Sequence, residues 1–384
     1  MRSKFFYLNL ISLLIIIPSL GLANSQQLPI DKLRDQKKIE FQKKKLMEKS
    51  KIRKKKKSKK KYKRTSKNCL TIKSIIFHKA TKINSSQKKL LSRNYIGKCI
   101  FNDEIGQLIN KVTNFYIDKG FLNARIYFKS YNYKLKTLNL LVSEGIIDSI
   151  ILKQYSKDKK PIKSKKFFDQ AKLFTAFPTQ KGKIFNIKDF EQGIYNLNRL
   201  SSNNAVIDSR PAKKDGKSDI IINNYKSKSF NISANYANTG SQSTGKNNVT
   251  KSISKDNLLQ INDQISFSQT KSKSSTTNNV NFSLPIGYYF FSYANSINKY
   301  SSNSNNIKSS GESRNHDLSL SRLIYRDKIY EINLKTSLNL RDQNRINSGV
   351  IDLASQRLST GRIGIDYKAN LSNKLNFYAG FTYS

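Results

Sequence analysis

Few side chains in this sequence could carry out catalysis. The 384 residues include only two histidines, His78 and His316, which fall in different parts of the chain. The sequence has no Gly-x-Ser-x-Gly elbow, no Gly-x-x-x-x-Gly-Lys phosphate loop and no metal-ligand spacing of Cys and His. Glu144 precedes Gly145 between two alternating segments, where a turn residue is expected rather than a catalytic acid. We therefore predict no catalytic residue, metal or cofactor, and no enzyme activity.

Cys69 and Cys99 are the only cysteines, and they could form a disulfide. The first residues, described next, indicate export into an oxidising compartment, where such a pair can bridge. A bridge closing a loop of about 30 residues would stabilise the fold by roughly 3 to 4 kcal/mol on the chain-entropy model. The alternative is two unrelated buried thiols. Because both cysteines flank one small predicted domain, we favour the disulfide.

Residues 1–23 have the layout of a cleavable signal peptide. Arg2 and Lys4 precede a short apolar run, Leu10–Ile17, and Gly21-Leu22-Ala23 forms a small-x-small cleavage site. The alternative is a membrane anchor, but the run is well short of the ~20 residues that a spanning helix needs. Nothing later is apolar enough to span as a helix, so any insertion into a membrane must use strands.

The chain is strongly basic, with 71 Lys and Arg against 25 Asp and Glu and a formal charge of +46. Such a charge could indicate a nucleic-acid or anionic-membrane partner. Residues 24–68 form a basic segment, in which 11 of the 14 residues of Lys51–Arg64 are Lys or Arg. This segment is expected to be a polar helix or a disordered linker. The excess of positive charge continues along the whole chain, so charge alone does not identify a nucleic-acid or membrane partner.

Residues 69–153 are expected to form a compact β-α-α-β-β domain. Asn102 is predicted to cap its main helix, in which apolar residues recur every three or four positions up to a C-terminal Gly120. A shorter polar helix, Ser85–Arg93, precedes it. The predicted strands are Thr71–His78, Leu122–Ser130, Leu135–Val142 and Ile146–Leu152.

Residues 154–228 are predicted to repeat this domain. Ile187, Phe190, Ile194 and Leu197 form one face of a helix, and Ser218–Asn223 follows as a strand. The chain therefore contains two similar units in tandem.

Residues 229–384 read as β-structure throughout. Polar loops such as Thr239–Thr250 and Ser301–Glu312 separate the alternating segments. Weakly two-sided strands with aromatic ends are typical of a transmembrane barrel, although a soluble sandwich has the same period. Long loops, the signal peptide and the lack of Cys and Trp in this part favour the membrane. We predict eight strand segments: Phe230–Ala237, Leu258–Thr270, Asn278–Leu284, Tyr288–Tyr300, His316–Tyr325, Ile329–Leu340, Gly361–Tyr367 and Leu375–Tyr383.

In this order, the segments resemble the transporters of two-partner secretion, the haemolysin activation and secretion proteins of the outer-membrane 85 superfamily. CLTIKSIIF, YIDKGFLNARIYF and LLVSEGIIDSIIL resemble the first polypeptide-transport-associated (POTRA) domain, where a cysteine pair also recurs. FPTQKGKIFNIKDFEQGIYNLNRL resembles the second, and SLPIGYYFFSYA an early barrel strand. The residues that match family motifs and are expected to have structural roles are Gly120, Glu144, Gly145, Asn186, Glu191, Asn198, Arg199 and Gly216.

The resemblance implies α+β tandem POTRA domains followed by an antiparallel transmembrane β-barrel. The family has 16 strands, so about eight segments, or half of the expected strands, make the chain look like a truncated or split member. The resemblance also implies an outer-membrane location in a Gram-negative bacterium, with the POTRA domains in the periplasm. Expected partners are outer-membrane lipid, barrel-assembly machinery for insertion and one secreted exoprotein exported without ATP; a monomer is expected, and a nucleic-acid partner is not.

The exoprotein is expected to bind as an added strand at an exposed POTRA sheet edge. The candidate edges are Leu122–Ser130 and Ala205–Arg210, unless other parts of the fold cover them. The predicted contact residues are Leu122, Ala124, Ile126, Phe128, Ala205 and Ile207.

Two other functions remain open. One is an insertase or assembly factor for outer-membrane proteins, although such proteins usually carry more than two POTRA domains. The other is a basic exported protein that binds nucleic acid or lipid through Lys51–Arg64.

Overall fold

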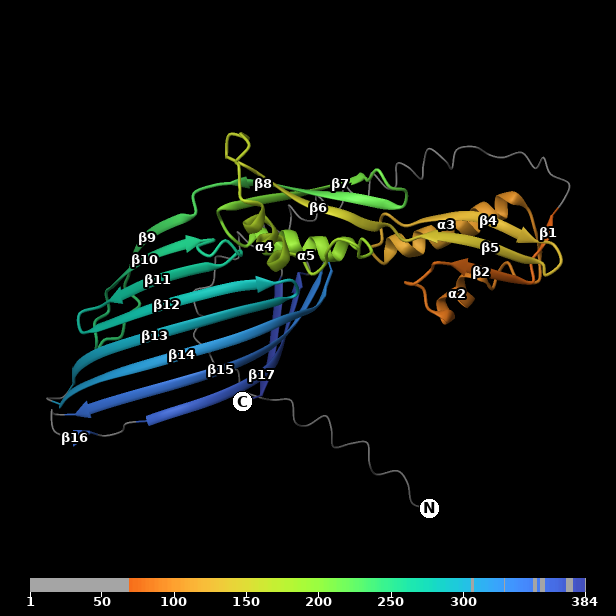
Figure 1. Cartoon of the computed structure of the whole chain (residues 1–384). Coiled ribbons are helices and arrows are strands. Elements are labelled where there is room, and N and C mark those ends of the chain that lie inside the picture. Colours follow the sequence, from red (N-terminus) through yellow and green to blue (C-terminus); the bar gives the residue numbers. More distant parts are fainter. Residues whose placement is uncertain are drawn as a thin grey trace, which may run out of the picture.

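Two small α/β units precede one long antiparallel sheet (Figure 1). The computed structural model describes residues 69–304, 307–327, 329–347, 351–352, 356–370 and 376–383. The predicted signal peptide and basic segment lie outside the described residues. None of the helices in the described part is both long and apolar enough to cross a membrane.

The first unit has the predicted β-α-α-β-β order. β2 lies parallel to β5, the central strand of the sheet, and β4 pairs antiparallel on the other side of β5. A separate two-stranded ribbon, β1–β3, splits the single strand that the sequence predicts over Thr71–His78. The elements are β1 (Leu70–Thr71), β2 (Ser74–His78), α2 (Ser85–Ser92), β3 (Cys99–Ile100), α3 (Asn102–Asp118), β4 (Arg125–Asn132) and β5 (Thr137–Ser143).

Helix α3 supplies much of the core of this unit. Its apolar stripe, including Leu108, Val112 and Tyr116, is buried against the sheet. Asn102, the predicted cap, is instead the first helical residue, and Phe101 occupies the N-cap position. The Phe101 N–H donates a 2.8 Å bond to the Glu104 carboxylate.

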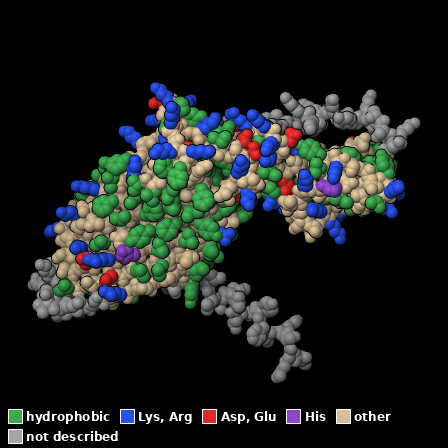
Figure 2. Space-filling model, viewed as in Figure 1, with side chains coloured by type: hydrophobic (Ala, Val, Ile, Leu, Met, Phe, Trp, Pro, Cys, Tyr) green, Lys and Arg blue, Asp and Glu red, His purple; other side chains and the backbone are tan. Residues whose placement is uncertain are grey.

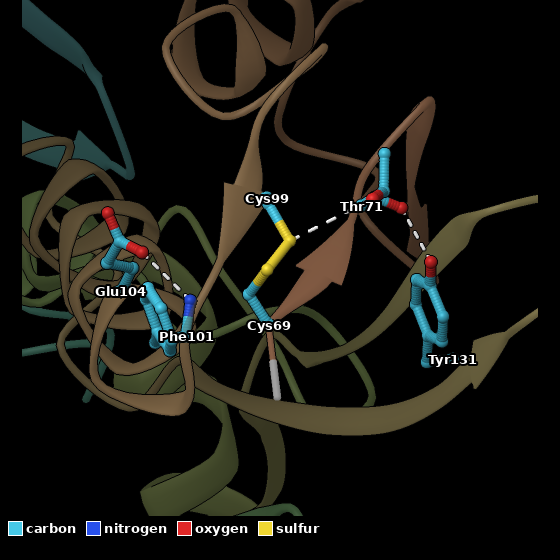
Figure 3. Close-up of a disulfide and its surroundings, with 6 residues drawn as sticks. All are labelled: Cys69, Thr71, Cys99, Phe101, Glu104 and Tyr131. Carbon is cyan, nitrogen blue, oxygen red and sulfur yellow. Dashed lines mark hydrogen bonds between the residues drawn. A yellow bond between two sulfur atoms is a disulfide. The ribbon is translucent and has the colours of Figure 1, made fainter. Parts of the chain in front are cut away.

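The structure joins Cys69 to Cys99, as the sequence analysis favours, and so ties β1 to β3 (Figure 3). The two Cα atoms lie 5.3 Å apart, and Thr71 is paired with Cys99 in the ribbon. The Tyr131 hydroxyl on β4 donates a 2.5 Å bond to the Thr71 carbonyl and connects this ribbon to the main sheet.

The second unit repeats the topology of the first. Here β6 lies parallel to the central β8, and β7 is the antiparallel edge. Phe185 and Phe190 stack at 4.9 Å in its core. The sequence analysis missed α4 because two of its apolar residues, Phe167 and Phe174, face outward. The elements are β6 (Ile146–Tyr155), α4 (Lys166–Ala176), α5 (Ile187–Asn198), β7 (Asn203–Pro211) and β8 (Lys217–Lys226).

The long sheet is an antiparallel meander of ten strands in the described residues, and β9 and β18 each pair there on one side only. The predicted loop Thr239–Thr250 is confirmed except for its last three residues, where β10 begins. The predicted loop Ser301–Glu312 was wrong, because β13 and β14 extend through most of it, and the predicted strand Leu258–Thr270 begins only at Gln264. The strands are β9 (Phe230–Ala237), β10 (Asn248–Asp256), β11 (Gln264–Lys271), β12 (Ser275–Ile286), β13 (Tyr289–Ser304), β14 (Ile307–Arg326), β15 (Tyr330–Asn347), β16 (Ile351–Asp352), β17 (Gln356–Asn370) and β18 (Asn376–Tyr383).

The registers divide this sheet into one apolar and one polar face. Because side chains alternate along a strand, paired residues share a face. One row on the apolar face runs across adjacent strands through Ile265, Phe282, Tyr293, Leu318 and Leu338. One row on the opposite face runs through Ser233, Ser252, Ser268, Asn279, Ser296 and Asn315.

Removal of the disulfide is expected to destabilise the first unit. A Cys69→Ser/Cys99→Ser variant should lose about 3 kcal/mol of unfolding free energy, because the unfolded chain is no longer closed into a loop. Urea unfolding of the whole chain, followed by proteolysis of the first unit, measures this loss. Reductant should produce a similar shift in the wild type and none in the variant; an equal midpoint for both oxidised proteins would contradict the prediction.

Candidate functional site

The two predicted binding edges are edges of their sheets. β4 and β7 each pair with one neighbour among the described strands. On β7, Ala205 is buried and Ile207 is half-buried against the core. At the first edge, Leu122 and Ala124 precede β4 and are buried. The buried side chains of Leu122, Ala124 and Ala205 therefore cannot contact a partner in this conformation.

Phe128 is the predicted contact residue that the structure exposes most, at 49% of its surface. Ile126, two positions earlier, is buried in the core. A bulge follows Phe128, because Phe128 pairs with Leu140 and Ser130 with Asn139, which leaves Lys129 as an extra residue. An added strand would therefore find backbone groups and two exposed aromatic side chains, Tyr127 and Phe128, before the bulge.

Gly120, Gly145, Asn186 and Gly216 meet at the joint between the two units. The Gly120 carbonyl accepts a bond of 2.9 Å from Ile187 N–H, and the Gly145 and Gly216 carbonyls accept similar bonds from neighbouring backbone. All three glycines have φ between +73° and +97°, a region that side chains disfavour. A Cβ on Gly120 would lie 2.5 Å from Asn186 Oδ1. These motif residues therefore allow close contact between the units.

Glu144 is more than a turn residue. Its buried carboxylate accepts bonds from the Thr81 N–H at 2.7 Å, the Lys82 N–H at 2.8 Å and the Tyr116 hydroxyl at 2.7 Å, and also from the Thr81 hydroxyl. The carboxylate thus connects the loop after β2 to α3 and to the start of the joint. The burial of Tyr116 and its bond to Glu144 raise the pKa of the phenol far above its ordinary value.

Helix α5 is bound to the turns of the long sheet. Asn196 and Gln192 both donate to the Gly287 carbonyl, at 2.7 and 3.2 Å, in the turn between β12 and β13. The next residue, Tyr288, donates a 2.5 Å bond to Asp189. Arg326, at the end of β14, donates to Gln192 at 2.7 Å. One face of a POTRA-like helix therefore holds two successive turns of the sheet.

Arg199 extends this contact at the end of α5. Its guanidinium donates to the Ser283 hydroxyl and the Asn262 carbonyl, and lies 5.3 Å from the centre of the Phe290 ring. Burial lowers the pKa of Arg199 to about 10. The adjacent Asn198 instead bonds the Ala205 backbone and fixes the start of β7. Glu191, another predicted motif residue, lies on the same helix.

The turn between β10 and β11, residues 257–263, is bound to α4. Asn262 is fully buried and donates 2.7 and 2.8 Å bonds to the Lys172 carbonyl and the Thr175 hydroxyl. The Lys172 ammonium in turn donates to Gln260 at 2.7 Å. Asn257, Gln260 and Asn262 all have positive φ, so the turn has a specific shape that the alternating pattern of Leu258–Thr270 did not predict.

The two histidines lie in separate elements, as expected. His78 on β2 contacts Asn139 at 2.9 Å, and His316 on β14 contacts the Tyr293 hydroxyl at 2.9 Å. In the described residues, no cluster of three or more His, Cys, Asp or Glu side chains could hold a metal ion.

The apolar face of the sheet forms a band of limited height. On β13 it runs from Tyr289 to Ile297, nine residues, which matches the ~9 to 11 residues of a tilted membrane-spanning strand. Beyond it, Lys299 pairs with Glu312 at 3.3 Å, and Glu312 accepts from Arg314 at 2.7 Å. Figure 2 shows hydrophobic side chains gathered across the middle of this face and charged ones beyond. The band has the pattern of a wall that faces lipid.

The contact around Lys172 predicts a pH-dependent stability. Burial lowers the pKa of Lys172 to about 8; the Lys226 ammonium adds to this, and Asp169 and Asp263 oppose it. Because the unfolded chain binds this proton up to about pH 10.5, the destabilisation is full below pH 8 and fades as the pH rises to about 10.5. Lys172→Met should therefore stabilise the protein by about 1 to 2 kcal/mol at pH 7 and by less at pH 10.

Thermal unfolding at pH 7 to 10 measures this difference between variant and wild type. Lys157→Met, at an exposed position, serves as the control and should behave as the wild type at each pH. A constant difference between Lys172→Met and wild type across this range would contradict the assignment.

The described geometry agrees with three family matches. Haemolysin secretion/activation protein ShlB/FhaC/HecB matches residues 216–384, POTRA domain matches 146–211, and POTRA domain, ShlB-type, matches 70–145. The outer membrane transporter CdiB of Dickeya dadantii (strain 3937) is 26% identical over 314 residues, covering 79% of this chain and 54% of that protein. The hemolysin transporter protein ShlB of Serratia marcescens is 25% identical over 316 residues, with the same two shares. The chain thus spans about half the length of these relatives.

Solved structures share the fold. CdiB from Escherichia coli has a TM-score of 0.71 at 21% identity, over 94% of this chain and 68% of that one. CdiB from Acinetobacter baumannii has a TM-score of 0.63 at 20% identity, over 83% and 63%. The match runs through both α/β units and into the two-faced sheet, so these units are tandem POTRA domains and the sheet is part of a β-barrel wall. Residues 216–384 thus match the haemolysin secretion/activation protein family, and the two units before them match POTRA domains.

Proposed function

We propose that this protein is an outer-membrane transporter that binds an unfolded exoprotein in the periplasm through its POTRA domains and secretes it along a β-barrel wall without ATP. The observation that carries this proposal is the two-faced sheet held directly on the second POTRA domain. Its apolar face suits lipid, and its Ser- and Asn-rich face suits an aqueous path. The relatives CdiB and ShlB are named as transporters.

The geometry favours binding first at a POTRA edge and then passage along the polar face. An edge strand offers backbone groups to almost any extended sequence, and exposed side chains such as Phe128 add a preference. Asp256, at the end of β10, accepts bonds from the Ser201 hydroxyl and the Ser202 N–H and so holds the start of β7 next to a turn of the sheet. A segment captured at β7 would then lie close to the entrance of the polar face.

The other proposed partners follow from a location in the outer membrane. The apolar face contacts outer-membrane lipid, and barrel-assembly machinery inserts the sheet. The protein acts as a monomer, needs no nucleic acid and catalyses no covalent reaction. Because β6 belongs to the sheet of the second unit, we place the boundary between the POTRA domains at residues 145 and 146 and not at 153 and 154. The domains proposed are 69–145 and 146–228 for the POTRA domains and 229–384 for the barrel part.

An arginine should be costly on one face of β15 and tolerated on the other. Leu338→Arg places a charge at the middle of the apolar face and should cost about 2 to 4 kcal/mol in lipid. Asn339→Arg, the matched control on the polar face, should be tolerated. The measurement is the amount of each variant in the outer membrane and its mobility on a gel with and without boiling. Equal loss for both variants would contradict a lipid-facing wall.

Photo-cross-linking is expected to locate the exoprotein at the sheet edges. A cross-linking amino acid at Phe128 or Ser209 should capture a co-expressed secreted protein of the haemolysin type, and the adduct should decrease once the protein reaches the medium. The control position is Lys89, which is exposed on α2 away from both edges. Adducts at Lys89 as strong as those at Phe128 and Ser209 would contradict edge binding.

A further inference from the structure

We propose that a basic and aromatic patch on the second POTRA domain lies in the headgroup layer of the periplasmic leaflet and binds anionic phospholipid. This rim patch consists of Phe167 and Phe174 on α4, Leu258 and Leu259 in the β10–β11 turn, and the lysines of residues 157–166. The inference rests on the proposed function, because it requires the apolar face of the sheet to lie in a membrane.

The apolar members of the rim patch are exposed although their elements are firmly held. Phe167 is 74% exposed, Phe174 61%, Leu258 53% and Leu259 56%. Phe167 and Phe174 are seven positions apart and so share one face of α4. The opposite face of α4 binds the sheet through Lys172 and Thr175. The fold therefore presents these side chains outward.

The height of the rim patch matches a membrane interface. The Gly287 N–H donates a 2.8 Å bond to the Thr175 carbonyl of α4. Gly287 and Tyr288 form the turn between the paired residues Ile286 and Tyr289, where the apolar band begins. Because the headgroup region adds about 5 to 8 Å on each side of the hydrocarbon, α4 falls within it. Figure 2 shows hydrophobic side chains continuing from the sheet to the region of α4 on the same face, with Lys and Arg around them.

The charge next to these side chains suits anionic headgroups. Residues 157–166 contain six lysines, all exposed, and one acid, Asp158. The nearby Asp169 is bound by Gln154 and Ser164. Lysines near an anionic surface are attracted to it, and aromatic side chains favour the interface. Continuity with the lipid-facing band and this charge favour lipid over an exoprotein or a second copy of the chain.

A single tryptophan tests the position of the rim patch, because the chain contains none. Phe167→Trp is prepared in the full chain, extracted from outer membranes and reconstituted into phosphatidylethanolamine vesicles with phosphatidylglycerol that is brominated high on the acyl chain. We expect blue-shifted fluorescence with about twofold quenching by the brominated lipid. Replacement of Lys163, Lys165 and Lys166 by Gln should weaken this quenching, as should phosphatidylcholine in place of phosphatidylglycerol.

Matched variants separate the possible outcomes. Phe291→Trp on the apolar band should be quenched, and Tyr133→Trp, 77% exposed on the first POTRA domain beside Lys129, Lys134 and Lys136, should not. Quenching at position 291 without quenching at 167 would overturn the rim patch and leave the proposed function intact. No quenching at 291 would overturn both. A blue shift at 167 that depends on protein concentration and not on bromine would indicate a second copy and also overturn it.

Discussion

The carbonyl of Gly287 is the point on which the arrangement of the molecule depends. It lies in the turn between two long strands, and two buried amides of α5, Gln192 and Asn196, donate to it. Gly287 has φ +58°, and a Cβ there would lie 3.1 Å from the Pro178 backbone. Buried amides without partners cost about 1 to 3 kcal/mol each, so the helix and the turn stabilise each other. Tyr288 and Arg326 extend the same contact to neighbouring residues.

A second set of close backbone contacts connects the two POTRA domains. There Gly120 and Gly145 accept bonds from the second domain, Gly216 accepts a bond from the first residue of β6, and Glu144 holds the adjacent loop. Both joints use glycines where a Cβ would lie close to the neighbouring domain, and both are bridged by hydrogen bonds. The first POTRA domain is therefore held on the second by backbone bonds and by Ile117 and Leu122, which pack into the core of the second unit. The second domain is held on the sheet by the polar contacts of α5.

Much of the fold could be predicted from the sequence because local patterns determine it. The stripe of α3 and the alternation of β12 to β15 are strong signals, and both POTRA units were recognised from their order. Helix α4 was missed because it buries Lys172 and exposes Phe167, the reverse of the usual pattern. β10 was missed because its polar face is made of Ser and Thr, which also occur in loops.

The sequence identified several residues of the site but not the contacts that they make. Gly120, Asn186 and Arg199 were recognised as motif positions, but their roles depend on partners distant in the chain, which no local pattern contains. The predicted edge strands are edges, yet Leu122, Ala124 and Ala205 point into the core, because a sheet edge exposes backbone while its inner side chains still pack.

The row of Ser233, Ser252, Ser268, Asn279 and Ser296 on the polar face has a consequence for the range of cargo. Hydroxyl and amide groups bond with each other, as Ser233 and Ser252 do at 2.6 Å, and carry no net charge. If an exoprotein passes along this face as proposed, it would meet only uncharged groups at these five residues and a charge at Arg341, which follows Asn315 in the same row. This stretch would not discriminate between acidic and basic sequences, so under the proposed function the choice of cargo is made at the POTRA edges.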